Sequence, residues 1–277
     1  MIRSLAAPVR VTPVHCASVH GGAMYIKAEE VQKPLFNFTI SARGKNAELP
    51  VFAFLRRRYG NIPLNQIESM FGFVERSTLY GGRPFTGSEL SDNDVTDLNK
   101  AGIGLRLPLT NHEVSREEYE GARALLTRYH HKLNSVIATN DDLATWIAED
   151  FPLYKRDASV IKNINNPRKL ARAMEIYDSV VLPMPCNEDF EFLESIEYKD
   201  RITLFANAGC AMTCPSRICY ASFSEFNKFK GADILCSQTI KERESFGMID
   251  FQLEPLLALG FTHFKLLRSR PGAQTGF

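Results

Sequence analysis

Four of the six cysteines in this chain lie close together, between positions 210 and 236. Cys210, Cys214 and Cys219 follow an apolar run at 202–205, and Cys236 follows a second apolar run at 232–235. If these runs are neighbouring parallel strands, the segments that follow them meet at one edge of the sheet. Four thiolates at one point can bind zinc or an iron–sulfur cluster. The sequence therefore predicts a metal centre built from these four sulfurs.

The cysteine spacing bears on which centre is bound. Zinc sites favour pairs spaced C-x2-C, whereas this chain has the looser spacing C-x3-C-x4-C-x16-C, which suits a larger group. We therefore expect a [4Fe–4S] cluster, with zinc as the alternative and unliganded core cysteines as a third interpretation. Cys186, which also ends a predicted strand, is a reserve ligand. The simpler interpretation of Cys186 and Cys16 is that each is a small buried hydrophobic residue.

Two charged residues alternate on another predicted strand, near 153–161. Lys155 and Asp157 are two positions apart, so their side chains point to the same face. Inside a barrel such groups can bind substrate or transfer protons, which makes both of them candidate catalytic residues. The alternative is a buried ion pair that fills one layer of the barrel interior.

Arginines lie near the ends of three predicted strands, at Arg83, Arg106 and Arg268. A guanidinium group pairs with a carboxylate or phosphate through two parallel hydrogen bonds. We therefore take these arginines as candidate substrate-binding residues, although each of them alone is also compatible with a structural or solvated role.

The elements that must position these residues alternate between strand and helix. Eight strand candidates follow residue 71, and most are separated by a helix; they lie at 72–79, 103–109, 135–138, 153–161, 179–182, 202–206, 232–235 and 263–267. The helix expected after 103–109 begins with a capping box, Ser115-x-x-Glu118. Repeated βα units predict a parallel sheet. Eight units over this length favour an α/β fold of the (β/α)8 TIM-like barrel type, with an open doubly wound sheet as the alternative.

The chain before the predicted barrel divides into an extension and a small module. Residues 1–70 are expected to form an N-terminal extension and module, with a strand near 36–40 and short helices at 52–59 and 64–70; residues 71–277 are expected to form the barrel. The first 23 residues contain no Asp or Glu. They resemble an organelle transit peptide, or alternatively an irregular extension before a second start at Met24.

Composition narrows the class of protein. Hydrophobic residues make up 44% and charged residues 23% of the 277 positions, as in ordinary globular proteins. A net charge of +1 gives no argument for nucleic-acid binding, and no apolar run is long enough for a membrane span. Clustered cysteines, too few for a disulfide scaffold, indicate a reducing compartment, and we expect a cytoplasmic protein.

Several motifs that would identify other enzyme classes do not occur. No predicted strand is followed by GxGxxG, and no Walker sequence is present, which argues against dinucleotide and P-loop sites. The sequence also lacks GxSxG and HExxH, which disfavours a conventional serine or zinc protease.

Two segments resemble a known family. Residues 217–222 read RICYAS, and the stretch 259–268 reads LGFTHFKLLR. Together with the sixteen-residue gap from Cys219 to Cys236, they resemble the collagenase-like peptidase U32 family and its relatives that hydroxylate without oxygen. The resemblance covers roughly residues 70 to 270 and implies a barrel with a strand ending in a cysteine. This chain departs from the family in having no cysteine after Cys236, so Cys214 would complete the ligand set.

The leading hypothesis combines the cysteines with this resemblance. It is an iron–sulfur barrel enzyme that hydroxylates an RNA base or a small aromatic ring without oxygen. In this hypothesis the arginines and Lys155 would hold an anionic substrate. One alternative is a non-catalytic, metal-stabilised barrel that acts through a protein partner. The other alternative is a U32-type peptidase.

Overall fold

The computed structural model describes residues 34–214, 216–229, 231–239 and 249–267. The transit-peptide-like segment at 1–23, which includes Cys16, lies outside the described residues, and so does Arg268.

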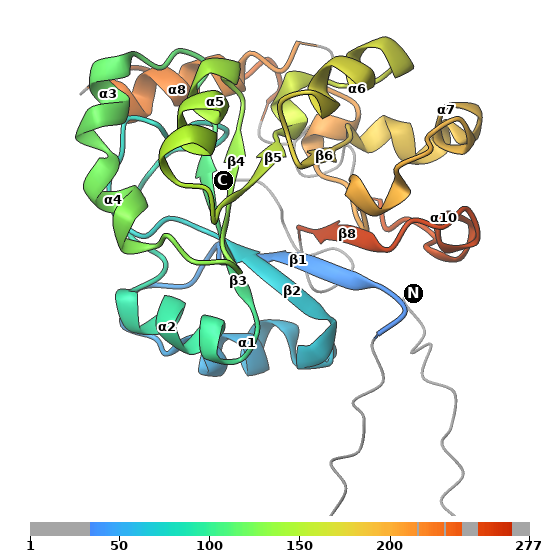
Figure 1. Cartoon of the computed structure of the whole chain (residues 1–277), viewed down its shortest axis with the longest axis horizontal. Helices are drawn as coiled ribbons and strands as arrows, with labels where there is room; N and C mark the ends of the chain where they lie inside the picture. The colour runs from blue at the N-terminus through green and yellow to red at the C-terminus, as the bar shows by residue number, and fades with distance from the viewer. Residues whose placement is uncertain (1–33, 215, 230, 240–248, 268–277) are drawn as a thin grey trace, which may run out of the picture. The chain divides into compact units, whose positions relative to one another are not determined.

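Eight parallel strands form a closed barrel in which each strand pairs with its neighbours in sequence and β1 pairs with β8. The strands are β1 (Asn37–Ser41), β2 (Ile67–Phe71), β3 (Gly104–Leu109), β4 (Ser135–Ala138), β5 (Lys155–Ala158), β6 (Ser179–Val181), β7 (Ile202–Phe205) and β8 (His263–Leu266). Helices lie around the outside of these strands (Figure 1). The predicted (β/α)8 barrel is therefore confirmed.

Alternation along each strand separates an apolar outer face from a polar interior. In β3, Leu105, Leu107 and Leu109 are fully buried in the main hydrophobic core, between the strands and the helices. Arg106, between them, points inward and pairs with Asp157 of β5. The main core therefore surrounds the barrel, and its interior is free to carry polar groups.

The helices that cover the barrel are mostly short. They are α1 (Val51–Tyr59), α2 (Asp92–Lys100), α3 (Arg116–Gly121), α4 (Arg123–Arg128), α5 (Asp141–Asp150), α6 (Pro167–Met174), α7 (Phe190–Glu194), α8 (Cys219–Lys228) and α10 (Glu254–Ala258). Capping boxes at Ser91 and Ser115 begin α2 and α3, and the second of these was expected from the sequence. None of the described helices is long and apolar enough to cross a membrane.

The structure corrects the identity of three predicted elements. The first two barrel strands are β1 and β2, which both precede residue 72, and β2 replaces most of the helix expected at 64–70. Residues 72–79 form no strand; their apolar residues Phe73 and Leu79 are instead fully buried as part of a loop. Residues 232–235 also form no strand, and Leu235 is 49% exposed. Apolar runs identified buried or strand-like segments, but did not show which of them pair.

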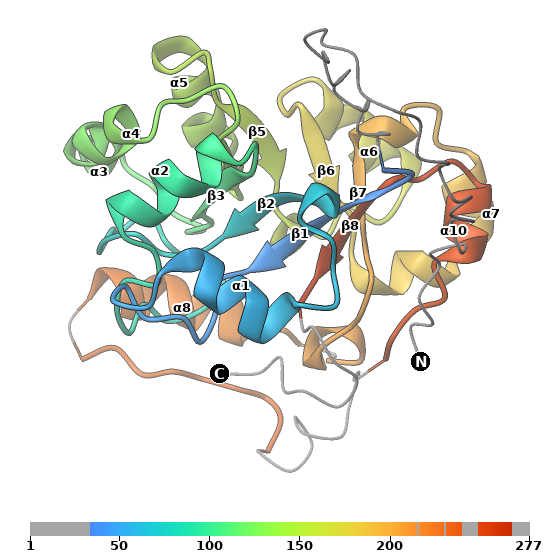
Figure 2. The same cartoon turned by 90° about the horizontal axis from the view of Figure 1, so that it is seen from below.

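Helix α8, which contains Cys219, lies over the loops that follow β2 and β3. The buried side chain of Asn227 donates to the carbonyls of Tyr80, at 3.1 Å, and Arg83, at 3.0 Å. Lys228, the last residue of α8, forms an ion pair with Glu118 of α3 at 2.9 Å. Figure 2 shows the chain after α8 running as an extended segment toward the β7 side. In the closed barrel, β7 is separated from β2 by β8 and β1, whereas α8 contacts the loop after β2. The segment between β7 and α8 therefore crosses the end of the barrel.

Candidate functional site

A cavity of about 190 Å³ lies at the end of the barrel where the parallel strands terminate. Ser41, Phe71 and Phe205, the last residues of β1, β2 and β7, line it together with Ser159, directly after β5. The carboxyl ends of barrel strands are the usual position of active sites in this architecture. The position of this cavity makes it the candidate functional site.

Two glycines shape one wall of this cavity. A Cβ atom on Gly81 would lie 2.3 Å from the carbonyl oxygen of Thr110, so no larger residue fits there. Gly82 has a φ of +72°, a left-handed conformation that glycine adopts without strain. These two residues let the loop after β2 turn closely against the loop after β3 and carry Arg83 to the cavity.

Two arginines line the cavity, Arg43 and Arg83. Arg83 forms an ion pair with Glu89 and lies over the ring of Phe73, 3.9 Å from its centroid. Burial and the nearby charge of Arg83 lower the pKa of Arg43 to about 10, so Arg43 still carries its charge at neutral pH. The cavity therefore presents positive charge from two loops to any bound molecule.

A third basic side chain, Lys265 of β8, lines the same cavity. Its residue is only 8% exposed, and its Nζ atom lies 4.4 Å from the ring centroid of Phe71. Burial and then the charge of Arg106 lower the pKa of Lys265 to about 7. Sequence reasoning missed this residue as a site residue, although a lysine within the apolar run 263–267 was an available signal.

Of the four predicted metal ligands, Cys210 lines the cavity. It begins a short 3-10 turn after β7, and Cys219 is the first residue of α8. Cys214 accepts a hydrogen bond from the backbone amide of Arg217 at 3.3 Å and contacts the hydroxyl of Ser237 at 3.5 Å. The Ser237 contact brings the segment that contains Cys236 back to the loop after β7.

The pKa of Cys219 shows that the four cysteines influence one another. Burial, followed by the charges of Cys210, Cys236 and Cys214, raises the pKa of Cys219 to about 11. Although burial opposes it, hydrogen bonding from Ser237 and from the backbone amide of Arg217 lowers the pKa of Cys214. The charges of the other three cysteines therefore act on Cys219. Among the described residues, however, no group of three or more His, Cys, Asp or Glu side chains is arranged so that it could hold a metal ion.

Cys186 differs from these four. It is 5% exposed and belongs to the main hydrophobic core. Burial and the charge of Asp189 raise the pKa of its thiol to about 11, with no contribution from another cysteine. This environment is that of a small buried hydrophobic residue.

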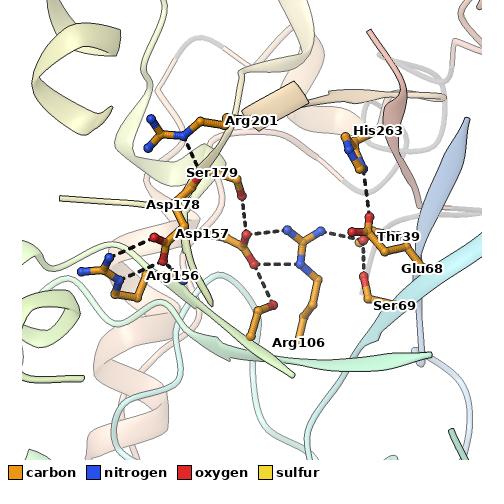
Figure 3. A network of polar contacts seen from close by, with 11 residues as sticks. Thr39, Glu68, Ser69, Arg106, Arg156, Asp157, Asp178, Ser179, Arg201 and His263 are labelled. Atoms are coloured by element: carbon orange, nitrogen blue, oxygen red, sulfur yellow. Dashed lines mark hydrogen bonds and ion pairs between the residues drawn. The ribbon is translucent and has the colours of Figure 1, made fainter. Parts of the chain in front are cut away.

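The predicted residues Arg106 and Asp157 lie inside the barrel (Figure 3). Arg106 Nη2 lies 2.7 Å from Asp157 Oδ1, and Arg106 Nε donates to Asp157 Oδ2 at 2.8 Å. The hydroxyl groups of Ser135 and Ser179 also donate to this carboxylate, and Arg106 donates to Thr39 at 2.6 Å. The structure therefore joins two residues that the sequence analysis had assigned to different roles.

Lys155 lies at the opposite end of the barrel from the cavity. It is the first residue of β5, it is exposed, and its charge helps to lower the pKa of Glu68. Burial acts against that shift, but the hydrogen bond from His263 and the charge of Arg106 outweigh it and bring the pKa of Glu68 to about 2.

Among the predicted site residues, Lys155, Asp157 and Arg106 do not line the cavity, whereas Arg83 and Cys210 do.

Comparisons with known proteins bear on the fold. No family model and no curated protein matches this sequence. Among solved structures, the U32 peptidase Mk0906 matches with a TM-score of 0.59 and 13% sequence identity, over 93% of this chain and 98% of that chain. A glycerophosphodiester phosphodiesterase from Agrobacterium tumefaciens str. C58 matches at a TM-score of 0.41 and 7% identity, over 86% of this chain and 96% of that chain. The chain therefore has a fold similar to that of a U32 peptidase.

Proposed function

We propose that this protein is a U32-like barrel enzyme that binds a [4Fe–4S] cluster beside a pocket for a small anionic substrate. The observation that carries the proposal is that Cys210 lines the same cavity as Arg43, Arg83 and Lys265. A cluster held by this cysteine would adjoin the place where a substrate binds. This arrangement supports an enzyme over a barrel whose metal serves only for folding.

The donor set is chemically suited to such a cluster. Cys210, Cys214, Cys219 and Cys236 would hold it, because thiolates are the usual ligands of iron–sulfur clusters. Burial and, after it, the charges of the other three cysteines raise the pKa of Cys219, and a bound metal centre would offset both effects because a coordinated thiol is deprotonated. When bound, a cluster supplies one-electron transfer. Zinc at the same four sulfurs is the alternative cofactor.

The cavity indicates the class of substrate. Arg43 and Arg83 would orient a carboxylate or phosphate, and the rings of Phe71 and Phe205 offer apolar walls to a planar group. Its volume of about 190 Å³ suits a small aromatic molecule or a single base of an RNA. We propose oxygen-independent hydroxylation of such a ring. In this reaction a ring C–H and water give C–OH, two protons and two electrons, and a redox protein that accepts one electron at a time would take the two electrons in turn.

For the peptidase alternative, the described residues contain a Ser–His pair, but its serine is not accessible. His112 Nδ1 lies 3.0 Å from Ser224 Oγ, a distance compatible with a Ser–His pair. Ser224, however, is 5% exposed, and its hydroxyl lies 3.2 Å from the carbonyl of Tyr220 within α8. A nucleophile must reach its substrate, so this pair favours a structural role.

Anaerobic purification tests the cluster directly. The wild-type protein should contain iron and acid-labile sulfide and should absorb visible light at about 400 nm, as iron–sulfur proteins do. Cys214→Ala should lose most of the iron, whereas Cys186→Ala, which alters a core cysteine, should retain it. Zinc in place of iron would support the metal-stabilised barrel. Absence of any metal from wild-type protein, together with peptide cleavage that survives Cys214→Ala, would support the peptidase instead.

A further inference from the structure

We propose that Lys265 is a carbonyl-reactive amine, and that the cavity takes a small aldehyde or ketone bearing a carboxylate or phosphate. Lys265 would hold this molecule as an imine. The proposal uses the cavity of the proposed function and names a further property of its ligand, but it does not depend on the cluster.

The position of Lys265 is the first argument. Its backbone pairs with Thr39 of β1 and Phe205 of β7, and its side chain lines the cavity. Nζ lies 4.4 Å from the ring centroid of Phe71 and 5.8 Å from that of Phe205. Within the part of the chain that the structure describes, no carboxylate forms an ion pair with it. A buried amine between two aromatic rings is thus directed at an open cavity.

Lys45 provides a matched contrast. It is also buried, at 4% exposure, but its Nζ donates to Asp94 at 2.6 Å and to two backbone carbonyls at 3.0 Å. The Nζ atom of Lys45 is thus occupied by structural hydrogen bonds. Lys265 lacks a comparable carboxylate partner, so its amine is available to a ligand.

The surroundings of Lys265 favour its neutral form, which is the nucleophile. Burial contributes most to lowering its pKa to about 7, and the positive charges of Arg106 and Arg83 act in the same direction. Asp157, the one facing carboxylate that acts on it, opposes them but is itself paired with Arg106. An amine desolvated beside other cations is a recognised setting for imine formation. A substantial fraction of Lys265 is therefore unprotonated near neutral pH.

The other cavity residues define the rest of the ligand. Arg43 and Arg83 supply two positive charges beside the carboxylate of Glu89, and an anionic group on the ligand would balance the remaining positive charge. The apolar walls and the volume of about 190 Å³ limit the ligand to a small molecule. A carbonyl compound with one acidic group satisfies both the amine and the guanidinium groups.

The reaction balances without a further reactant. The neutral amine attacks the carbonyl carbon to give a carbinolamine, with proton transfer from nitrogen to the new oxygen. Loss of water and uptake of one proton from solvent then give a protonated imine. Hydrolysis by water reverses these steps and releases the carbonyl compound and the amine.

Reductive trapping tests the proposal. Metal-free wild-type protein is treated with glyoxylate and cyanoborohydride at pH 7.5, and the products are mapped by mass spectrometry after digestion. Hydride reduction of the imine leaves one carboxymethyl group on the reacting lysine. Lys265 should be modified at least about tenfold faster than Lys100, an exposed lysine, because far more of its amine is neutral. Equal rates at the two sites would overturn the proposal.

Variants and competition give independent readouts. Lys265→Met should abolish the fast adduct, whereas Lys100→Met should retain it. Inorganic phosphate should slow modification of Lys265 in the wild-type protein by occupying the arginines, and should leave Lys100 unaffected; an equal effect on both would contradict the cavity assignment. Because the protein is metal-free, a positive result stands even if the iron analysis fails, and a negative result leaves the cluster proposal intact.

Discussion

Arg106 and Asp157 face each other inside the barrel, joined by contacts of 2.7 Å and 2.8 Å. Both side chains are nearly inaccessible to solvent. The carboxylate also accepts from serines on the flanking strands, so one pair ties β3, β4, β5 and β6 together. Asp157 raises the pKa of Arg106, although burial acts in the opposite direction.

Replacing Asp157 should therefore destabilise the protein strongly. Asp157→Asn leaves the Arg106 charge buried without its partner, and we expect a loss of about 3 kcal/mol in the free energy of unfolding. Urea unfolding followed by circular dichroism measures this change. Asp97→Asn breaks an exposed pair with Lys100 and should cost less than about 1 kcal/mol. Similar costs for the two variants would mean that the buried pair does not hold the barrel as described.

The buried amine of Lys265 should make stability depend on pH. Its folded pKa of about 7 lies below the ordinary value of 10.5, so between these values the unfolded chain binds a proton that the folded protein lacks. The free energy of unfolding therefore rises with pH between about 7 and 10.5. Below pH 7 Lys265 is charged in the folded protein too, so the full penalty for burying that charge lowers the stability.

Lys265→Met should remove that dependence. We expect the stability of the variant relative to wild type to be about 4 kcal/mol greater at pH 6 than near pH 10, because each unit of pKa shift corresponds to about 1.4 kcal/mol. Urea unfolding at the two pH values measures both differences. Lys100→Met, at an exposed position, should show no such trend. A difference that stays constant with pH would show that Lys265 titrates normally.

The loop that carries Arg83 should depend on Gly81. Gly81→Ala would place a Cβ 2.3 Å from a backbone carbonyl oxygen, a clash that only movement of the loop relieves. We expect a loss of about 2 kcal/mol in stability. Gly121→Ala provides the control, because nothing lies within 4 Å of its added Cβ and alanine is the better helix former; it should gain about 0.5 kcal/mol. Wild-type stability in Gly81→Ala would contradict the close approach of the two loops.

Asn227 should anchor the cysteine-bearing segment. Its side chain accepts from the amide of Phe85 at 2.7 Å and donates to two carbonyls of the loop after β2. Asn227→Ala removes the partner of the Phe85 amide and of the Arg83 carbonyl, so we expect a loss of about 2 kcal/mol in the free energy of unfolding. Hydrogen exchange should also speed up in α8 and the preceding loop. Glu225→Ala, at an exposed position of the same helix, should change neither property by much; equal effects would show that Asn227 is not the anchor.

Local signals in the sequence were enough to predict the fold class. Leu105, Leu107 and Leu109 alternate with polar or small residues, and the capping box at Ser115 begins a helix where expected. These features depend on residues within a few positions of one another. The repeated strand and helix patterns therefore predicted the barrel.

Pairing between distant strands decided which segments form the barrel. Residues 232–235 have the composition of a strand but lie in an exposed loop, whereas β2 contains Glu68 and Ser69 and is nonetheless a barrel strand. A barrel strand can contain polar side chains when other strands supply their hydrogen-bond partners, as His263 of β8 does for the partly exposed Glu68 of β2. Composition within one segment cannot reveal a partner almost two hundred positions away.

The same division holds for the candidate site. The sequence by itself determined that four cysteines lie close along the chain. Only the tertiary structure placed Cys210 and Arg83 at one cavity, moved Asp157 into an ion pair, and directed Lys265 between two aromatic rings. The physical reason is barrel closure: β8 reaches both β1 and β7, so the surroundings of Lys265 come from opposite ends of the chain.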